Sequence, residues 1–229
     1  MPYGVCLVRR FLAEGLSGVG SVVTLSEEVS HHVLRVTGIA PGETVELFDG
    51  AGAACHAVLL GSENGLARLK IVKCVAQESP GVRVDLVVAQ TRANTMDTVL
   101  RMVTELGVQS IQVVHTERCV ARGDKRERWR RIVESAAAQC GQNHVPEVRS
   151  PLPLSDVLSS VKGVRLVCAP GSPVGSFPGD RVTILVGPEG GLSESELADA
   201  ERCGWTQVGL AETVLRADTA AVAAVVRYG

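Results

Sequence analysis

The 229-residue sequence lacks a long apolar run, paired cysteines and a strong net charge. No segment approaches the roughly 18 or more consecutive apolar residues of a membrane span. The first fifteen residues, MPYGVCLVRRFLAEG, have no basic start followed by a long apolar core, which a signal peptide would need. We therefore expect a cytoplasmic protein without a membrane segment.

The cysteines are dispersed, and none stands in a C-x-x-C pair. An odd number without close spacing favours reduced thiols over a disulfide framework or a zinc site, so we expect no metal. A dinucleotide fingerprint is also missing. In DGAGAAC, residues 49–55, Cys55 stands where the third glycine belongs and no helical pattern follows, so this stretch predicts a hairpin turn. A Rossmann-type oxidoreductase is thereby excluded.

The net charge of −2 argues by itself against a nucleic-acid-binding protein, but the charge is unevenly distributed. Residues 118–131, RCVARGDKRERWRR, carry seven arginines and lysines against two acids. A run with so few acids does not fit a ladder of i,i+4 salt bridges. A patch that faces phosphates and a solvated helix face are the two interpretations that remain.

Two regions with different patterns follow one another along the chain. Residues 1–76 contain short alternating strands separated by glycine, proline and asparagine, with one helix near residues 26–36, which is typical of a small barrel or sandwich. Residues 77–229 alternate buried strands with helices. Such alternation predicts an α/β domain with a mostly parallel sheet, whose ligands bind at the carboxyl ends of the strands.

The stretch LVGPEGGLSESEL joins an apolar strand to a helix through a glycine-rich turn. Ser193 and Glu196 form an S-x-x-E capping box. The glycines at 190 and 191 let the backbone approach a ligand closely, whereas Glu189 disfavours a phosphate. A neutral or cationic ligand with hydroxyl or amine donors fits this turn better.

The stretch GLAETVLRADTAAVAAV, residues 209–225, leads into a helix made almost entirely of alanine and valine. We expect Asp218 or Thr219 to cap it. A helix that is apolar on every side is buried or lies in a subunit interface. Arg216 stands just before it, at the same sheet end as the glycine-rich turn, which favours a role in a site over capping of another helix.

Together these motifs closely resemble the bacterial 16S rRNA uridine-N3 methyltransferases, a family of the SPOUT, or α/β-knot, class. LVGPEGGLSESEL and GLAETVLRADTAA match its paired C-terminal motifs. VRRFLAEGL, SHHVLRVTGIAPGETVELFDGAG, VTELGVQSI and RERWRRIVESAAAQCGQNHVP also match, in the same order along nearly the whole chain.

The resemblance implies an N-terminal PUA-like β-barrel that helps to hold RNA (residues 1–76) and a C-terminal knotted methyltransferase domain (77–229). It also implies S-adenosylmethionine as cofactor, 16S rRNA or the small ribosomal subunit as partner, and a homodimer. The residues that match its cofactor loops are Ala169, Pro170, Val186, Gly187, Pro188, Glu189, Gly190, Gly191, Leu210, Val214, Leu215 and Arg216.

Methylation of uridine N3 removes a proton and leaves negative charge on the carbonyl oxygens of the base. A fixed guanidinium would stabilise that charge, and Arg216 and Arg9 are the catalytic candidates. No histidine is placed by the sequence as the general base. The candidates for RNA binding are Arg9, Arg10, His32, Arg35, Arg92, Arg122, Lys125, Arg126 and Arg128, with surface or core packing the alternative for His32.

The sequence departs from the family pattern at several positions. Gln142 and Thr213 stand where a basic residue is usual, which bears on substrate affinity or target. Asp218 replaces a glutamate and Arg92 a lysine, so charge is kept there, while Ala211 replaces a glycine. A knotted methyltransferase for another RNA such as tRNA, or an inactive RNA-binding relative, are the alternative functions.

Overall fold

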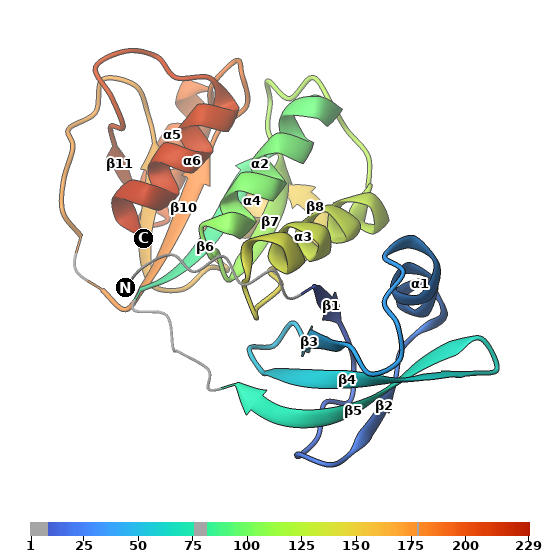
Figure 1. The fold of residues 1–229 in the computed structure, drawn as a ribbon. Helices are drawn as coiled ribbons and strands as arrows, with labels where there is room; N and C mark the ends of the chain where they lie inside the picture. The colour runs from blue at the N-terminus through green and yellow to red at the C-terminus, as the bar shows by residue number, and fades with distance from the viewer. Residues whose placement is uncertain (1–8, 76–81, 178) are drawn as a thin grey trace. The chain divides into compact units, whose positions relative to one another are not determined.

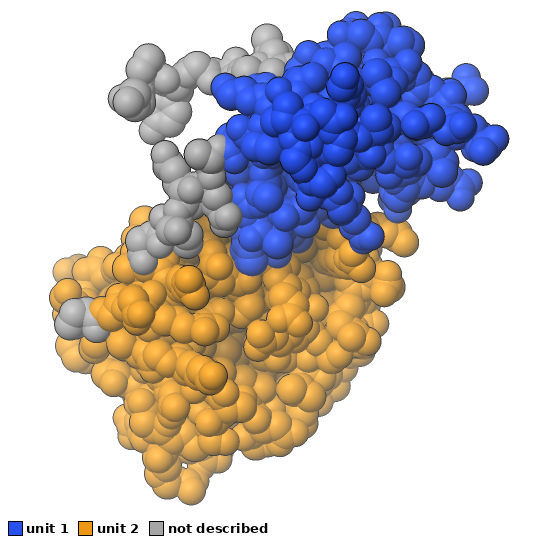
Figure 2. Space-filling model, turned by 90° about the horizontal axis from the view of Figure 1, so that it is seen from below, with its two compact units in different colours: residues 1–79, 137–145 blue, residues 80–136, 146–229 orange. Residues whose placement is uncertain are grey.

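The structure is a computed structural model that describes residues 9–75, 82–177 and 179–229 (Figure 1). Two compact units are distinguished in Figure 2: unit 1 comprises Met1–Ser79 and Ala137–Val145, and unit 2 comprises Pro80–Ala136 and Pro146–Gly229. The domain boundary predicted between residues 76 and 77 falls within 76–81, outside the described residues. The return of residues 137–145 to unit 1 is not foreseen by the sequence.

Unit 1 is built on a five-stranded mixed sheet in the order β1-β3-β4-β5-β2. The short β1 runs parallel to β3, and the other neighbours are antiparallel. Alternate residues of the long strands, such as Leu47, Leu59 and Leu69, enter one apolar core. The β-rich region predicted from the alternation is confirmed. Its strands are β1 (Arg10–Leu12), β2 (Val22–Thr24), β3 (Thr44–Phe48), β4 (Ala54–Glu63) and β5 (Leu66–Val75).

The turn and the helix predicted in unit 1 are both present. Oδ1 of Asp49 accepts hydrogen bonds from the backbone N–H groups of Ala51 (2.8 Å) and Ala53 (2.9 Å), which closes the β3–β4 hairpin. The segment Glu27–Val36 is helical, but only Glu27–His31 (α1) is α-helical, and His32–Val36 (η1) winds as a π-helix. Ser26 caps α1 by accepting from the N–H of Val29 (3.4 Å).

Residues 137–145 complete the packing of unit 1. Ala137 is fully buried and forms a cluster with Phe48 and Ala54. The N–H of Val145 donates to the carbonyl of Gly50 at 2.8 Å. The end of α3 (Arg126–Cys140) and the turn after it therefore close one side of the β3–β4 hairpin.

Unit 2 contains a six-stranded sheet in the order β11-β9-β10-β6-β7-β8, and all of its pairings are parallel. This confirms the predicted α/β class with a mostly parallel sheet. Buried apolar residues fill the central strands, as expected where helices cover both faces. The strands are β6 (Arg83–Ala89), β7 (Ser110–His115), β8 (Glu147–Pro153), β9 (Val164–Cys168), β10 (Arg181–Val186) and β11 (Thr206–Val208).

Helices cover the two faces of this sheet (Figure 1). α6 (Ala217–Tyr228) packs against α2 (Ala93–Glu105) and lies over β6 and β10. On the other face, α4 (Leu154–Leu158) and α5 (Glu194–Arg202) bury an apolar cluster that includes Val87 of β6.

The cap predicted for the last helix is wrong. α6 begins at Ala217 with Arg216 at the N-cap, because Arg216 is the last residue with extended backbone (φ −66°, ψ 156°). Asp218 and Thr219 therefore lie inside the first turn, where Oδ1 of Asp218 accepts from the N–H of Thr219 (2.8 Å).

The sequence also gives no signal for β8. Glu147–Pro153, EVRSPLP, contains two prolines and is mostly solvent-accessible. It pairs only with β7, at the edge of the sheet, where a missing backbone donor is tolerated.

Candidate functional site

A cavity of about 350 Å³ lies at the carboxyl ends of the strands of unit 2. Three segments form it: the residues after β9, the turn after β10 and the loop between β11 and α6. Since β9 lies between β10 and β11, parallel pairing brings these three ends to one edge. The lining residues are Arg118, Cys168, Ala169, Pro170, Val186, Gly187, Pro188, Glu189, Gly190, Gly191, Leu192, Leu197, Leu210, Ala211, Thr213, Val214, Leu215, Ala217 and Ala220.

All of the predicted cofactor residues except Arg216 line this cavity. Their predicted role in binding the cofactor stays a prediction, but the structure brings the three loops together. The sequence reasoning missed Arg118, which comes from the loop after β7, and also the alanines of α6 that form part of the wall. Small side chains inside an otherwise apolar helix are the only signal that could have indicated such a wall.

The turn after β10 is held by its own backbone. The N–H of Gly191 donates to the carbonyl of Pro188 at 2.8 Å, and Gly191 has a φ of +71°, a region that disfavours other residues. At the end of the turn, the capping box of α5 is confirmed. Ser193 Oγ accepts from the N–H of Glu196 (3.3 Å), and Glu196 Oε2 accepts from the N–H of Ser193 (2.9 Å).

The loop after β11 is fixed by a close approach to the long connection between β9 and β10. The N–H of Gly209 donates to the carbonyl of Pro173 at 3.0 Å. A Cβ at Gly209 would lie 2.1 Å from the carbonyl oxygen of Ser172, so no other residue fits without a shift of the backbone. Further along, the hydroxyl of Tyr228 donates to the carbonyl of Gly209 (2.9 Å).

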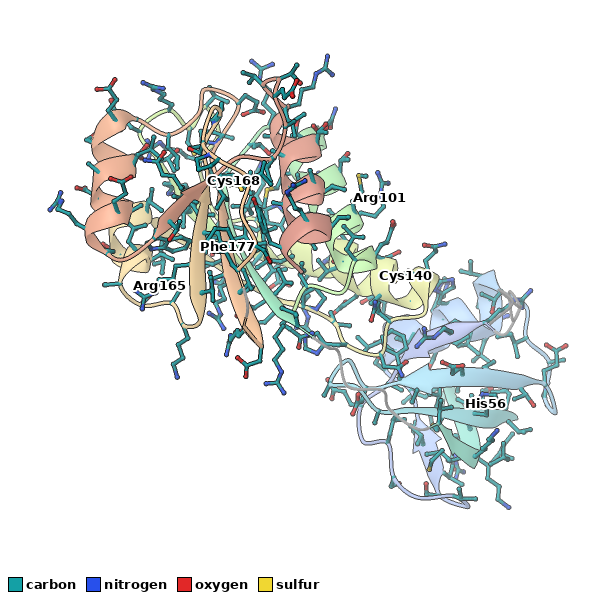
Figure 3. All side chains as sticks on the ribbon, turned by 90° about the vertical axis from the view of Figure 1, so that its left-hand side faces the viewer. His56, Arg101, Cys140, Arg165, Cys168 and Phe177 are labelled. Atoms are coloured by element: carbon teal, nitrogen blue, oxygen red, sulfur yellow. The ribbon has the colours of Figure 1, made fainter. Side chains whose placement is uncertain are left out.

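The walls of the cavity are mainly apolar and its rim is charged. Val186 and Leu192 are buried, while Glu189 is exposed. Burial raises the pKa of the Cys168 thiol to about 12, so the thiol stays neutral at the end of β9 (Figure 3) and contributes a weakly polar wall. Apolar walls suit a ligand with a flat apolar portion, and the rim carries one carboxylate, of Glu189, and one guanidinium, of Arg118.

The two predicted catalytic arginines lie in different units. Arg216, in unit 2, is exposed at the N-cap of α6, directly after two residues that line the cavity. Within the described part of the chain, its guanidinium makes no hydrogen bond or ion pair. Arg9, in unit 1, is also exposed, and its Nη1 donates to the carbonyl of Thr37 at 2.5 Å. The catalytic roles of both residues stay predictions.

Arg10 has a different environment from Arg9. Its Nε lies 3.0 Å from Oε1 of Glu46, and its Nη2 donates to Oδ1 of Asn143 at 2.5 Å. Its guanidinium carbon also lies 4.9 Å from the ring centroid of Phe48. The side chain is only 10% exposed. These contacts favour a structural role within unit 1 over the predicted contact with phosphate or base.

The other predicted RNA contacts in unit 1 and at the start of α2 are exposed. His32 stands edge-on to Phe11, with 5.7 Å between the ring centroids. No hydrogen bond or ion pair is described for the side chain of Arg35 on η1 or of Arg92 before α2. Both guanidinium groups are therefore available to solvent or to a ligand.

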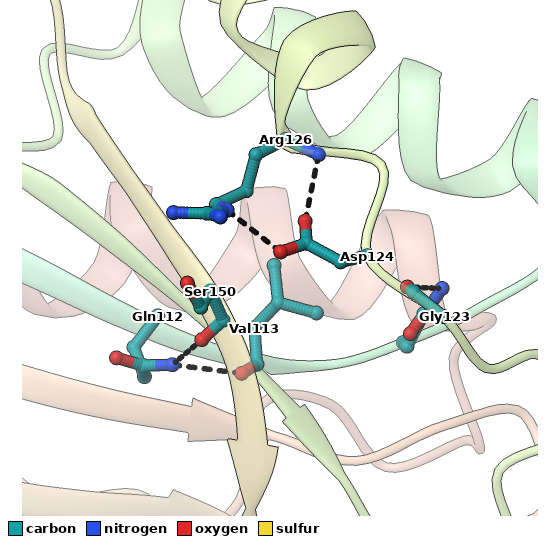
Figure 4. A network of polar contacts seen from close by, with 7 residues as sticks. Gln112, Val113, Gly123, Asp124, Arg126 and Ser150 are labelled. Atoms are coloured by element: carbon teal, nitrogen blue, oxygen red, sulfur yellow. Dashed lines mark hydrogen bonds and ion pairs between the residues drawn. The ribbon is translucent and has the colours of Figure 1, made fainter.

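In the structure, acidic side chains neutralise part of the positive charge of the basic run at 118–131. Arg126 forms an ion pair with Asp124 (Nε to Oδ2, 2.7 Å; Figure 4), and Arg128 forms one with Asp97 of α2. The acid of the second pair comes from outside the run. By contrast, Arg122 and Lys125 are exposed, and no side-chain partner is described for either. The unpaired positive charge is therefore concentrated in the loop before α3.

A histidine and a glutamine hold the far end of this loop. Gln90 Nε2 donates to the carbonyl of Gly123 (3.0 Å), and Gln90 Oε1 lies 2.8 Å from His115 Nε2. The pKa of His115 is lowered, mainly by burial and also by the charge of Arg122. Neutral His115 can still donate through Nε2, so the contact with Gln90 does not require protonation.

Two absences can be reported for the described residues. No group of three or more histidine, cysteine, aspartate or glutamate side chains among them could hold a metal ion. None of the helices that the structure describes is long and apolar enough to span a membrane.

Comparison with known proteins agrees with the geometry. The family model described as "RNA methyltransferase domain" matches residues 77–228. "Ribosomal RNA small subunit methyltransferase E" of Synechocystis is 30% identical over 216 residues, covering 88% of this chain and 71% of that protein. Its namesake from Mycobacterium tuberculosis is 29% identical over 244 residues, covering 96% and 90%.

Solved structures are similar over almost the full length. A "Ribosomal RNA small subunit methyltransferase E" from Neisseria gonorrhoeae bound to S-adenosyl methionine has a TM-score of 0.90 at 31% identity, covering 96% of this chain and 95% of that one. A putative methyltransferase from Legionella pneumophila in complex with the same cofactor has a TM-score of 0.88 at 28% identity, covering 96% of each. The chain belongs to the RNA methyltransferase domain family and, within it, to the ribosomal RNA small subunit methyltransferase E proteins.

Proposed function

We propose that this protein transfers the methyl group of S-adenosylmethionine to N3 of a uridine in 16S rRNA of the small ribosomal subunit. The observation that carries the proposal is the three-loop cavity at the carboxyl ends of β9, β10 and β11. Its volume of about 350 Å³ lies within the roughly 300–1,000 Å³ typical of small-molecule sites. In two similar solved structures the bound small molecule is this cofactor.

The residues of the cavity fit the chemistry of the cofactor. Val186, Leu210 and Leu215 offer apolar surface for an adenine ring, and the backbone of the turn offers hydrogen bonds to its edge. The exposed carboxylate of Glu189 attracts an ammonium or sulfonium group and would repel a phosphate. When bound, the cofactor supplies an electrophilic methyl group on a positively charged sulfur.

In this proposal Arg216 stabilises the reacting base. A bond forms between uridine N3 and the methyl carbon, the carbon–sulfur bond breaks, and the N3 proton is released to solvent. Negative charge on the carbonyl oxygens of the base rises as the proton leaves. An exposed, unpaired guanidinium beside the cavity is suited to bind that charge in the transition state.

The RNA would lie along the unpaired cations of unit 2, Arg92, Arg122 and Lys125, and along Arg9 and Arg35 of unit 1. We also propose that the mixed sheet of unit 1 is a PUA-like barrel that helps to hold the RNA, and that the protein acts as a homodimer. Exposed apolar side chains on α6 and at the C-terminal end of α2 support an interface: Val226 is 66% exposed, and Leu106, which directly follows α2, is 42% exposed. Two helices that pack against each other thus leave apolar surface in water.

The chain would also be knotted where α6 follows the sheet. Support comes from the connection between β9 and β10, which touches the last segment at two places. Pro173 accepts a hydrogen bond from Gly209, and the rings of Phe177 and Tyr228 lie 5.9 Å apart (Figure 3 labels Phe177). The terminal segment therefore runs against this connection before and at the end of α6.

Nucleoside mass spectrometry tests the proposal. The purified protein would be incubated with S-adenosylmethionine and small ribosomal subunits that lack the modification, with heat-inactivated protein as control, and the RNA would be digested. We expect 3-methyluridine only with the active protein. If tRNA is methylated instead, the target in the proposal is wrong. If the protein binds cofactor and RNA but methylates neither, it is an RNA-binding relative without this activity.

A further inference from the structure

Arg118 links the basic loop after β7 to the turn that lines the cavity. Its Nη1 donates to the carbonyl of Gly190 at 3.0 Å and to that of Leu192 at 3.3 Å. The approach is close along the backbone as well, since a Cβ at Gly190 would lie 3.3 Å from Cβ of Arg118. One nitrogen of the guanidinium thus donates to two carbonyl groups of the turn.

Glu196 makes a second link between the same two segments. Its Oε2 accepts from the N–H of Ser193, in the capping box, and its Oε1 accepts from the N–H of Glu117 at 2.8 Å. One carboxylate therefore fixes the end of the turn and the backbone next to Arg118. A capping box requires only one of these bonds, so the second is additional to what the helix needs.

The loop is also fixed at its other end, where Gly123 accepts a hydrogen bond from Gln90. Between the two fixed ends lie Val120, which is 67% exposed, and the exposed Arg122. An RNA phosphate bound by Arg122 would therefore contact a loop whose first residues are hydrogen-bonded to the cofactor turn. The two binding surfaces share a short, covalently continuous connection.

We propose that Arg118 is a positioning residue that orders the Gly190–Leu192 backbone for the cofactor and couples cofactor binding to RNA binding. This inference rests on the proposed function. With both carbonyl groups held, the peptide planes of the turn have one orientation toward the cavity. Ordering of the loop by RNA then stabilises the turn, and by linkage the cofactor strengthens RNA binding by the same factor.

The test measures binding of S-adenosylhomocysteine, which cannot donate a methyl group, by calorimetry with and without a 16S rRNA fragment. In the wild type we expect tighter binding when RNA is present. Arg118→Ala is expected to weaken binding by about fivefold and to remove the RNA-dependent difference. Arg118→Lys should restore part of both effects, because an ammonium can still donate to one carbonyl.

The matched control is Arg131→Ala, which removes one exposed positive charge from the same basic run but has no contact with the turn. It should leave cofactor affinity and the coupling unchanged. Thermal unfolding of each variant separates a loss of fold from a loss of positioning.

The outcomes distinguish the inference from the proposed function. If wild-type protein binds the cofactor equally well with and without RNA, or if Arg118→Ala binds as the wild type does, the positioning role is wrong although the function stands. If wild-type protein does not bind the cofactor at all, the proposed function fails with it.

Discussion

The cofactor cavity and the basic run at 118–131 are built in different ways. The cavity depends on the course of its backbone: Gly191 and Gly209 occupy positions that only glycine fills without strain or collision. The basic run is formed by long side chains, some of which form ion pairs with acids such as Asp97 and Asp124. Sites made by backbone leave a mark in the sequence, because few residues satisfy the geometry. A site made of charged side chains leaves no such mark, because the sequence does not show which charges form ion pairs.

The largest expected effect is a loss of cofactor affinity when a side chain is added at a glycine of the cavity. In Gly190→Val, the Cβ would lie 3.3 Å from Cβ of Arg118, and the two γ-methyl groups would crowd the turn. We expect cofactor affinity to fall by about 30- to 100-fold by calorimetry. Gly190→Ala is the graded control and should have a smaller effect, since the neighbour must move by only a few tenths of an ångström. Unchanged affinity in the valine variant would place the cofactor elsewhere.

The next effect separates binding from chemistry at the same site. Arg216→Ala should lower the rate of methyl transfer by about 10²–10³-fold while cofactor affinity stays close to that of the wild type, because Arg216 does not line the cavity. Single-turnover kinetics and calorimetry give the two quantities. Arg202→Ala, which removes an exposed arginine from α5, is the control. A fall in cofactor affinity that accounts for the whole loss of rate would remove Arg216 from the mechanism.

A smaller effect distinguishes paired from unpaired charges in the basic run at 118–131. Reversal of Arg122 and Lys125 together should weaken RNA binding and lower the slope of log K against log salt by about 2. Reversal of Arg126 and Arg128 should change the slope less, because their partners Asp124 and Asp97 already neutralise them. Equal slopes for the two double variants would favour the other interpretation of the run, a solvated helix face.

The smallest effect concerns His115. Its pKa is lowered by burial and by Arg122, so we expect an NMR titration to give a value below 6.5, and Arg122→Ala to raise it. Since the folded state disfavours the proton, the associated stability is present above pH 6.5 and declines as the pH falls through the lowered pKa. A value unchanged by Arg122→Ala would show that the two side chains do not interact.

Much of unit 2 could be predicted because its signals are local. Val182–Val186 is apolar and followed at once by the glycine-rich turn, and the capping box of Ser193 and Glu196 marks the next helix. The resemblance to the family predicted which three loops meet at the site. Eleven of the twelve predicted cofactor residues line the cavity.

What could not be predicted depends on distant partners. Arg10 is held by Glu46 and Asn143, which are far from it in the sequence. The sequence shows Arg118 only as one charge of the run, because its acceptors are backbone carbonyl groups that no side-chain pattern encodes. β8 is an edge strand, so it carries neither the apolar run nor the alternation by which other strands are recognised.

The placement of residues 137–145 in unit 1 has a consequence for how the protein is made. The first unit cannot finish packing while the chain leaves the ribosome until well over half of it has been synthesised, because Ala137 and Val145 must reach Phe48 and Gly50. A fragment cut at the apparent boundary near residue 76 would leave that surface open to water. The unit that begins the chain is thus completed by its middle, so that no single cut of the chain separates the two units.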